Sequence, residues 1–231
     1  MPRPVFISSP ELEARQPTRS FSLNLTLWGR RALDALPDIE RAVGILARKG
    51  LTVDGRRVAF EIIEVGATEV FSLGDFHLHS DVGVSPELVI LLETPLILGG
   101  SLDRIDPLAL LRRCLGNAAY ELVAWDIEER DTVGILDRWA RDELATAGRA
   151  HVDRLGAELE LRSSQLHRVR VGVRRSRSTG SDFELRGVTG YLCVGGNLGP
   201  VLPWLQTASL GGLGQKRTQG FGEVRLATRL D

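Results

Sequence analysis

Lysine is nearly missing from this chain of 231 residues. Among its 29 cationic side chains only Lys49 and Lys216 are lysines, and all the others are arginines. A GC-rich genome would produce this bias without any functional cause. Arginine is nevertheless the cation whose planar fork suits phosphate groups, so the composition leaves room for a polyanionic partner.

Cysteine is equally scarce, because Cys114 and Cys193 are the only two. Both lie in apolar sequence without a metal-ligand spacing, which argues against a disulfide framework and predicts buried thiols in a reducing compartment. The chain also lacks any apolar run of about 18 residues, the length of a membrane helix, and its first residues contain no apolar signal core. We therefore expect a cytoplasmic protein.

Charged residues are plentiful, but the two signs are separated along the chain. Residues 101–161 carry thirteen acidic side chains against eight basic ones, whereas residues 162–231 carry eleven basic against four acidic. This asymmetry is informative although the net charge is only −1. The last third suits an anionic ligand, while the acidic segment suits a protein partner better than a nucleic acid.

Apolar periodicity in the first third predicts a strand, a helix and a second strand. Residues 21–27 alternate at period two, residues from Leu36 to Leu46 repeat at helical spacing until Gly50, and residues 58–65 form the second expected strand. This order fits half of a ferredoxin-like βαββαβ unit. The expected N-terminal domain covers residues 1–75.

The rest of the chain continues this α+β pattern. Residues 76–85 have turn residues without a sustained pattern and are expected to be a linker to a C-terminal domain over 86–231. That domain begins with an apolar strand ended by Pro95. Helical periodicity follows and exceeds what one ferredoxin-like unit needs, so we expect a helical insertion over about residues 120–158.

A β-hairpin with one arginine face is predicted after the helices. Valines alternate with arginines from Arg168, and no acidic residue occurs between Arg162 and Ser181. A solvated strand face is the plain alternative, but exposed faces normally mix both signs, so a polyanion explains the pattern better.

The stretch GLGQKRTQGFGEVRL, residues 212–226, has the spacing Gly-x-Gly-x5-Gly-x-Gly. It lacks Gly-Lys-Ser/Thr and leads into a strand, whereas nucleotide-binding loops open a helix. Nucleotide binding is therefore the weaker interpretation of this glycine turn, which we define as residues 211–222.

Together these segments resemble the CRISPR-associated pre-crRNA processing endoribonucleases, the Cas six family of the RAMP superfamily. The resemblance spans residues 21–226 and is carried by FSLNLTLWGRRALDALP, RRVAFEIIEVG, VILLETPLIL, RRSRS, RGVTGYLCVGG and GGLGQKRTQGFGEVRL. It implies an α+β fold of two tandem ferredoxin-like (RRM-like) domains, with a helical insertion in the second. It also implies cleavage of a repeat-derived RNA hairpin without metal or cofactor.

One feature departs from the family pattern. Members usually carry a strand and a helix, often with a catalytic histidine, before the part that matches residues 21–28, but only about twenty residues precede it here. We therefore expect a truncated first domain. Shorter relatives from type IV CRISPR systems rely on arginines instead, and this chain resembles them.

Metal-free RNA cleavage uses the 2′-hydroxyl as nucleophile, so a protein must align the attack, neutralise the phosphorane and assist proton movement. We expect Arg15, Arg30 and Arg217 to converge on the scissile phosphate, with Arg31 as an alternate. Plain surface guanidiniums are the alternative for each. His77 and His79 remain catalytic candidates, and without a third ligand nearby they do not indicate a metal site.

The other candidates are expected to hold RNA. The arginine hairpin would contact phosphates along a stem, and the glycine turn would let the backbone approach RNA and offer N–H groups to phosphate oxygens. The predicted RNA-binding residues are Arg31, Arg168, Arg170, Arg174, Arg175, Arg177, Gly211, Gly212, Gly214, Gln215, Lys216, Thr218, Gly220 and Gly222.

Two functional classes stay open at the level of sequence. In the first, the protein is an endoribonuclease that cuts pre-crRNA and keeps the crRNA stem-loop bound. In the second, it is a non-catalytic RAMP subunit that binds crRNA structurally within an effector complex. Other CRISPR subunits are expected partners in both, through the helical insertion.

Overall fold

The structure of the protein is a computed structural model. It describes residues 5–8, 24–53, 56–58, 61–62, 86–97, 106–131, 135–175, 182–215 and 221–228. The expected linker at 76–85 lies outside these residues, and so do several of the predicted site residues.

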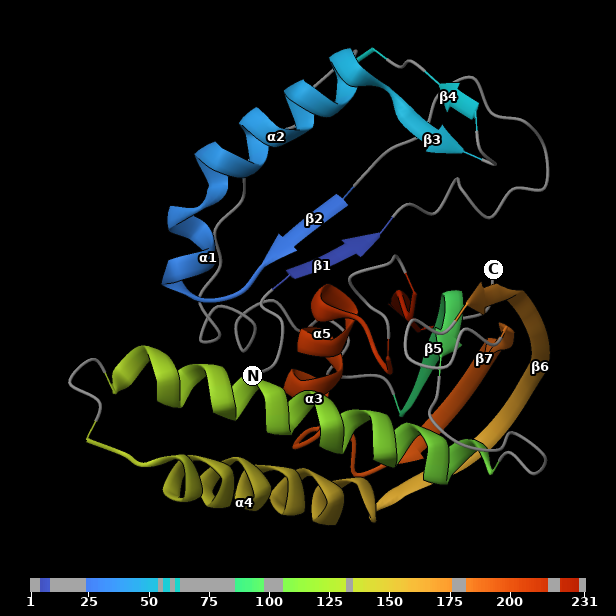
Figure 1. Cartoon of the computed structure of the whole chain (residues 1–231). Helices are drawn as coiled ribbons and strands as arrows, with labels where there is room; N and C mark the ends of the chain where they lie inside the picture. The colour runs from blue at the N-terminus through green and yellow to red at the C-terminus, as the bar shows by residue number, and fades with distance from the viewer. Residues whose placement is uncertain are drawn as a thin grey trace.

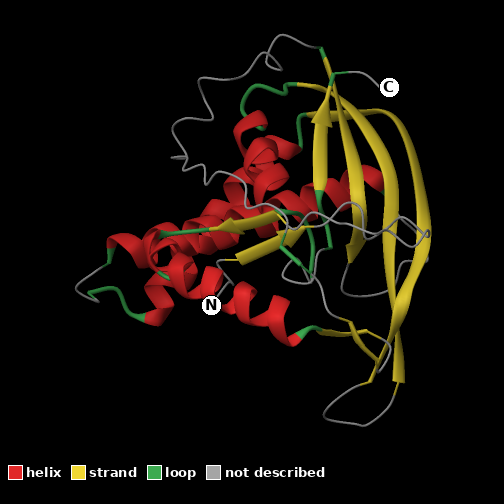
Figure 2. Cartoon of the chain, turned by 90° about the horizontal axis from the view of Figure 1, so that it is seen from above, coloured by secondary structure: helices red, strands yellow, loops and turns green. Residues whose placement is uncertain are grey.

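A four-stranded antiparallel sheet forms the centre of the C-terminal part (Figure 1). Its strand order is β6-β7-β5-β8. The strands are β5 (Glu87–Ile97), β6 (Leu159–Arg175), β7 (Asp182–Gly196) and β8 (Val224–Ala227). The helices on one side of the sheet (Figure 2) are α3 (Pro107–Arg130), α4 (Arg138–Gly156) and α5 (Leu202–Gly211). The protein is thus an α+β protein, and the elements of this part follow one another in the order β5-α3-α4-β6-β7-α5-β8.

The N-terminal part consists of two antiparallel strand pairs with two helices between them (Figure 1). The strands are β1 (Val5–Ser8), β2 (Asn24–Leu27), β3 (Leu51–Val53) and β4 (Arg56–Val58), and the helices are α1 (Arg30–Asp34) and α2 (Leu36–Lys49). The predicted helix and its end at Gly50 are confirmed, with Gly50 in the left-handed region at φ 76°.

Two details of the N-terminal part differ from the prediction. The strand β1 has no counterpart among the expected elements. The strand expected over 58–65 is wrong, because β4 ends at Val58 and neither Glu61 nor Ile62 belongs to a strand. The missed signal is the dipeptide Asp-Gly at 54–55, between β3 and β4, which is typical of tight hairpins.

The hydrophobic core lies between the sheet and its helices. The carboxylate of Asp106 accepts hydrogen bonds from the N–H groups of Leu108 and Ala109, which caps α3, and Pro107 starts the helix. One apolar face of α3 is then buried, apart from the half-buried Leu108. Its buried members are Leu111, Cys114, Leu115 and Leu122.

The strand β5 does not end at Pro95, as its sequence suggests, but continues to Ile97. The register between β5 and β7 shifts between Leu92 and Leu96, and this irregularity accommodates a residue that has no N–H to donate. The Pro95 carbonyl instead accepts a hydrogen bond from the N–H of Gly222 at 3.1 Å. The extra residues matter because they reach the glycine turn.

Candidate nucleic-acid interface

The described part of the glycine turn is tied to the end of β5. The N–H of Gln215 donates to the carbonyl of Ile97 at 2.8 Å, and the N–H of Leu213 donates to the carbonyl of Gly222 at 2.7 Å. The buried hydroxyl of Thr94 accepts a hydrogen bond from the N–H of Glu223 at 2.9 Å. The two ends of the turn are therefore held by each other and by β5, and the Thr-Pro pair of this strand has a structural role.

Positive φ angles and close contacts require glycine at two positions of the turn. Gly214 has φ 78°, and a Cβ there would lie 2.7 Å from the Ile97 carbonyl oxygen. Gly222 has φ 80°, and a Cβ there would collide with the carbonyl oxygen of Leu213. These two glycines are thus needed for the turn's own packing, whatever ligand it binds.

The predicted RNA-binding residues of the glycine turn differ in their exposure to solvent. Gly211, Gly212 and Gly222 are buried, Gly214 is partly buried, and Gln215 is exposed. Lys216, Arg217, Thr218 and Gly220 lie outside the described residues.

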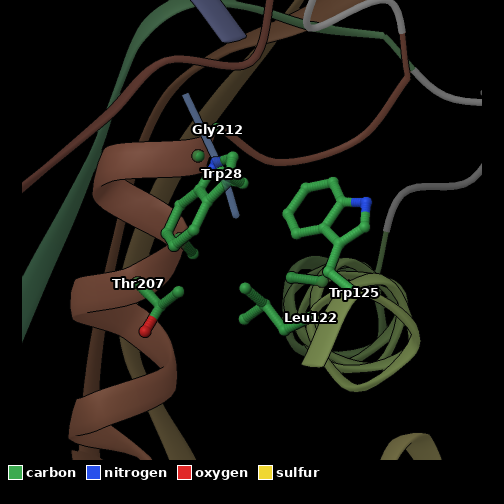
Figure 3. Close-up of a pocket in the computed structure, with 8 residues that line it drawn as sticks. Trp28, Leu122, Trp125, Thr207 and Gly212 are labelled. Carbon is green, nitrogen blue, oxygen red and sulfur yellow. The ribbon is translucent and has the colours of Figure 1, made fainter. Parts of the chain in front are cut away.

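The side chain of Trp28, just after β2, connects the N-terminal part to the glycine turn (Figure 3). Its ring stacks on that of Trp125 in α3, with centroids 5.7 Å apart and planes at 22°. The Trp28 ring also lies against Gly211, where a Cβ would come within 3.0 Å of it. Because Arg30 follows Trp28 by two residues, this contact brings the start of α1 near Gly211, the first residue of the glycine turn, which also contains Arg217.

A small cavity of about 10 Å³ lies between Trp28, Leu122, Trp125 and Thr207, no larger than one water molecule. Figure 3 shows the two indole rings and α5 around it. The Nε1 atom of Trp28 is buried and has no hydrogen-bond partner in the part of the chain that the structure describes. The cavity is too small for an organic ligand, so it marks a packing junction.

The arginine hairpin, β6 with β7, extends past β5 at the same end of the sheet as the glycine turn. Ile97, near the end of β5, pairs with Gly187 of β7 on one side and with Gln215 on the other. Gly187 in turn pairs with Val169, so the β6 residues from Arg170 onward lie beyond the end of β5. The two basic elements predicted from sequence therefore share one end of the molecule's main sheet.

Cross-strand pairing places Arg168, Arg170 and Arg186 on one face of this hairpin. Arg168 is opposite Val188, and Arg170 is opposite Arg186. Directly opposite residues share a face, and Val188 is fully buried under the helices. The arginines therefore lie on the same face of the sheet as the hydrophobic core. They occupy the end of that face, and the core lies nearer the centre of the sheet.

The strict alternation expected in β6 is interrupted. The pairing with β7 skips one residue between Arg170 and Gly172, which is a β-bulge. Gly172 has no neighbour within 4 Å of the position a Cβ would take, and glycine is common at such irregularities. The side chains of Arg174 and Arg175, later in β6, are not described, and Arg177 lies outside the described residues.

An acidic side chain from β7 faces the acid-free run of β6. Glu184 makes ion pairs with Arg170, at 2.8 Å between Nε and Oε1, and with Arg186. Neither Glu184 nor Arg186 stands out in the sequence, because their neighbours in the chain give no sign of what lies across the hairpin. A β-hairpin register drawn on the sequence would have brought them together.

The structure describes only the backbone of two predicted phosphate ligands. Arg30 and Arg31 start α1, directly after the junction at Trp28. Arg15 lies outside the described residues, as do the candidate histidines His77 and His79. The convergence of Arg15, Arg30 and Arg217 therefore stays a prediction.

The two cysteines do not belong to this interface. Burial raises the pKa of the Cys114 thiol to about 12, and nearby Arg113 offsets this only in part. Burial and the Glu87 carboxylate also raise the pKa of Cys193. Both are free and buried, as predicted, and as neutral thiols they are poor nucleophiles at neutral pH.

The described residues contain neither a metal centre nor a membrane-spanning helix. No group of three or more His, Cys, Asp or Glu side chains is placed there to hold a metal ion. None of the described helices is long and apolar enough to cross a membrane.

Comparisons with known proteins give a likeness of fold. No family model matches the chain, and no curated protein matches its sequence. A Cas6 product complex superposes with a TM-score of 0.57 at 16% identity, over 98% of this chain and 84% of that one. Thermus thermophilus Cas6 gives 0.53 at 17% identity, over 97% and 79%. A partial Cas6-RT-Cas1–Cas2 complex gives 0.50 at 14% identity, over 98% of this chain and 39% of the other. By fold, then, this chain resembles the Cas6 proteins, and the resemblance indicated by its motifs is confirmed.

Proposed function

We propose that the protein is an endoribonuclease that cleaves CRISPR repeat RNA and keeps the crRNA stem-loop bound. The observation that carries this proposal is the contact of Trp28 with Gly211, which puts the start of α1 beside the glycine turn at the end of the sheet from which the arginine hairpin extends. The Cas6 fold supports it. We also propose that the chain forms two tandem ferredoxin-like domains, over residues 1–75 and 86–231.

The proposed reaction is a transesterification that requires no metal. The 2′-hydroxyl oxygen attacks the adjacent phosphorus, the bond to the 5′-oxygen breaks, and the products are a 2′,3′-cyclic phosphate and a 5′-hydroxyl. The proton lost by the nucleophile and the proton gained by the leaving group balance. The protein has to hold the three reacting atoms in line and to stabilise the extra charge on the phosphorane.

Arginine fits the second task and not proton transfer, because it stays protonated at any physiological pH. We assign charge stabilisation to Arg30 and Arg217, with Arg15 as a third ligand and Arg31 as an alternate. Such a site resembles the arginine-dependent enzymes of type IV CRISPR systems and works slowly, which suffices for an RNA that is cut once and retained.

The experiment that tests this function uses purified protein and a labelled repeat RNA in EDTA. A single cut that leaves a 5′-hydroxyl is expected, and a 2′-deoxy nucleotide on the 5′ side of the cut should abolish it while binding persists. Binding without any cut would favour the alternative, a non-catalytic RAMP subunit. Substitutions R30A and R217A should slow the single-turnover rate at equal occupancy.

We also propose a protein-docking surface at the tip of the α3–α4 hairpin. Ile135 and Trp139 are 81% and 82% exposed there. The buried carboxylate of Asp131 holds this tip, because it accepts hydrogen bonds from the N–H groups of Ile135 and Leu136 and pairs with Arg141 at 2.7 Å.

Charge indicates which partner this surface suits. Residues 126–143 contain seven acidic and three basic side chains, so the tip carries a net −4. RNA is repelled by such a surface, whereas an apolar groove with basic residues around it is complementary. We propose a protein subunit of the same CRISPR system as the occupant. A photoreactive residue at position 139 should crosslink to such a subunit in cells; crosslinks to RNA or to a second copy of this chain would contradict the proposal.

A further inference from the structure

Three charged side chains meet on the arginine face of the hairpin. Arg170 and Arg186 are directly opposite each other on β6 and β7, and Glu184 lies two residues before Arg186, on the same face. The carboxylate engages the Nε atom of each arginine through a different oxygen. One anion thus holds two guanidinium groups side by side.

The terminal nitrogens of the two arginines are left for a ligand. Both side chains remain about two-thirds exposed, at 66% and 68%. Glu184 occupies the Nε atoms, and the Nη groups of both arginines have no partner among the described residues. A guanidinium has five N–H donors, so one contact with Glu184 leaves enough for bidentate contact with phosphate.

Folding stability is a weak explanation for this cluster. Like charges placed directly opposite each other on neighbouring strands are destabilising, and exposed ion pairs contribute only about 0–1 kcal/mol. The repulsion between the two opposed arginines therefore lowers folding stability, and the single carboxylate of Glu184 at best offsets this loss. The β-bulge after Arg170 interrupts the regular pairing of β6 with β7. Bulges of this kind are over-represented next to functional sites, where they re-aim side chains.

We propose that Glu184, Arg170 and Arg186 form a clamp for the phosphodiester backbone of an RNA stem, in which Arg186 is a further RNA-binding residue and Glu184 a positioning residue. The inference rests on the proposed RNA-binding function. It adds a physical reason for the protein to prefer an RNA stem over a single strand. Glu184 presets the spacing of the two guanidiniums, which suits the regular phosphates of a duplex. It also repels any strand whose phosphates do not reach both arginines.

The test compares two labelled RNAs, a stem-loop and an oligouridine strand of equal length. Substitution R186Q should weaken binding of the stem-loop about tenfold and make the plot of log K against log salt shallower by about 1. Substitution E184Q removes a negative charge and should tighten binding of oligouridine. The stem-loop should gain less, so the preference for the stem-loop falls about five- to tenfold.

The matched control is D38N, which makes the same charge change at an exposed ion pair with Arg41 on α2. It should leave the preference unchanged. If R186Q binds like the wild type, or if E184Q changes both affinities by the same factor, the clamp is wrong although RNA binding stands. If the wild type binds neither RNA, the proposed function fails with it. Thermal melting of each variant separates these results from a loss of fold.

Discussion

Single residues decide the shape of the glycine turn. Gly222 adopts a φ of 80° with its N–H bonded to Pro95 and its carbonyl bonded to Leu213. Neither neighbour can move away from a new side chain, because both contacts are made by backbone. The glycines of this motif are thus needed for the turn to fold, and any chemical role of the motif depends on the folded turn.

Substitution G222A should therefore destabilise the protein by about 1–3 kcal/mol and slow RNA cleavage. Urea denaturation and single-turnover kinetics measure the two effects. The control is G44A on α2, where the position of a Cβ has no neighbour within 4 Å. It should be neutral or stabilising by up to about 1 kcal/mol. Equal stability of the two variants would contradict the reading of the turn.

The carboxylate of Asp131, also a single residue, should make the folding stability of the protein depend on pH. Burial would raise the pKa of Asp131, but hydrogen bonds from the N–H groups of Ile135 and Leu136 and the charge of Arg141 outweigh burial and lower it. A lowered folded-state pKa means that the carboxylate stabilises the fold above its unfolded pKa of about 3.9. That contribution is lost as the pH falls through the folded pKa.

Substitution D131N should then reduce stability at neutral pH and flatten the acid side of the stability curve. Urea midpoints measured from neutral pH down to below about pH 4 test this. A wild type and a variant that lose stability in parallel over this range would show that Asp131 does not organise the α3–α4 connection.

At the scale of elements, the long hairpin of β6 and β7 is the feature that suits RNA. It continues beyond the end of β5 and carries Arg168, Arg170 and Arg186 on a single face. A duplex of RNA offers side chains mainly its backbone and shape. Binding by such an element depends on phosphate charge and hence on salt.

The double substitution R168Q/R170Q should make the salt dependence of RNA binding shallower by about 2 in the slope of log K against log salt. Affinity titrations between about 50 and 200 mM salt measure it. The matched control is R138Q/R149Q on α4, which removes the same charge from the acidic helical layer. An unchanged slope in the hairpin variant would remove the hairpin from the interface.

At the scale of the whole molecule, the stacked rings of Trp28 and Trp125 join the N-terminal part to the C-terminal part. Trp28 lies between Trp125 of α3 and Gly211 at the end of α5. Elements far apart in the chain therefore meet where the proposed cleavage site lies. This arrangement makes the geometry of the site depend on the packing of an apolar side chain.

Substitution W28A should reduce the rate of RNA cleavage more than the affinity for RNA, and should cost about 2–4 kcal/mol of stability. Single-turnover rates at saturating protein, compared with binding titrations, separate the two. The substitution W28F keeps a ring against Gly211 and should restore most of the rate. Equal losses of rate and affinity in W28A would argue against a positioning role.

Much of the secondary structure could be predicted, because it follows from local patterns. Alternation, helical spacing and the stop at Gly50 identified β2, α2, α3, the β6–β7 hairpin and β8. The predictions failed where pairing between strands overrides the local preference of a residue. β5 passes through Pro95 because a bulge and a hydrogen bond from Gly222 compensate, and Glu184 balances arginines that its own neighbours do not reveal.

Local chemistry alone was enough to establish the α+β class, the buried thiols, the arginine hairpin and the glycine turn, because each depends on residues close together in the chain. Tertiary packing decided which of them meet. The stack of Trp28 on Trp125, its contact with Gly211 and the bridge of Ile97 to Gln215 join segments remote in sequence. Such contacts depend on how apolar surfaces fit together in three dimensions, and no spacing along the chain encodes them.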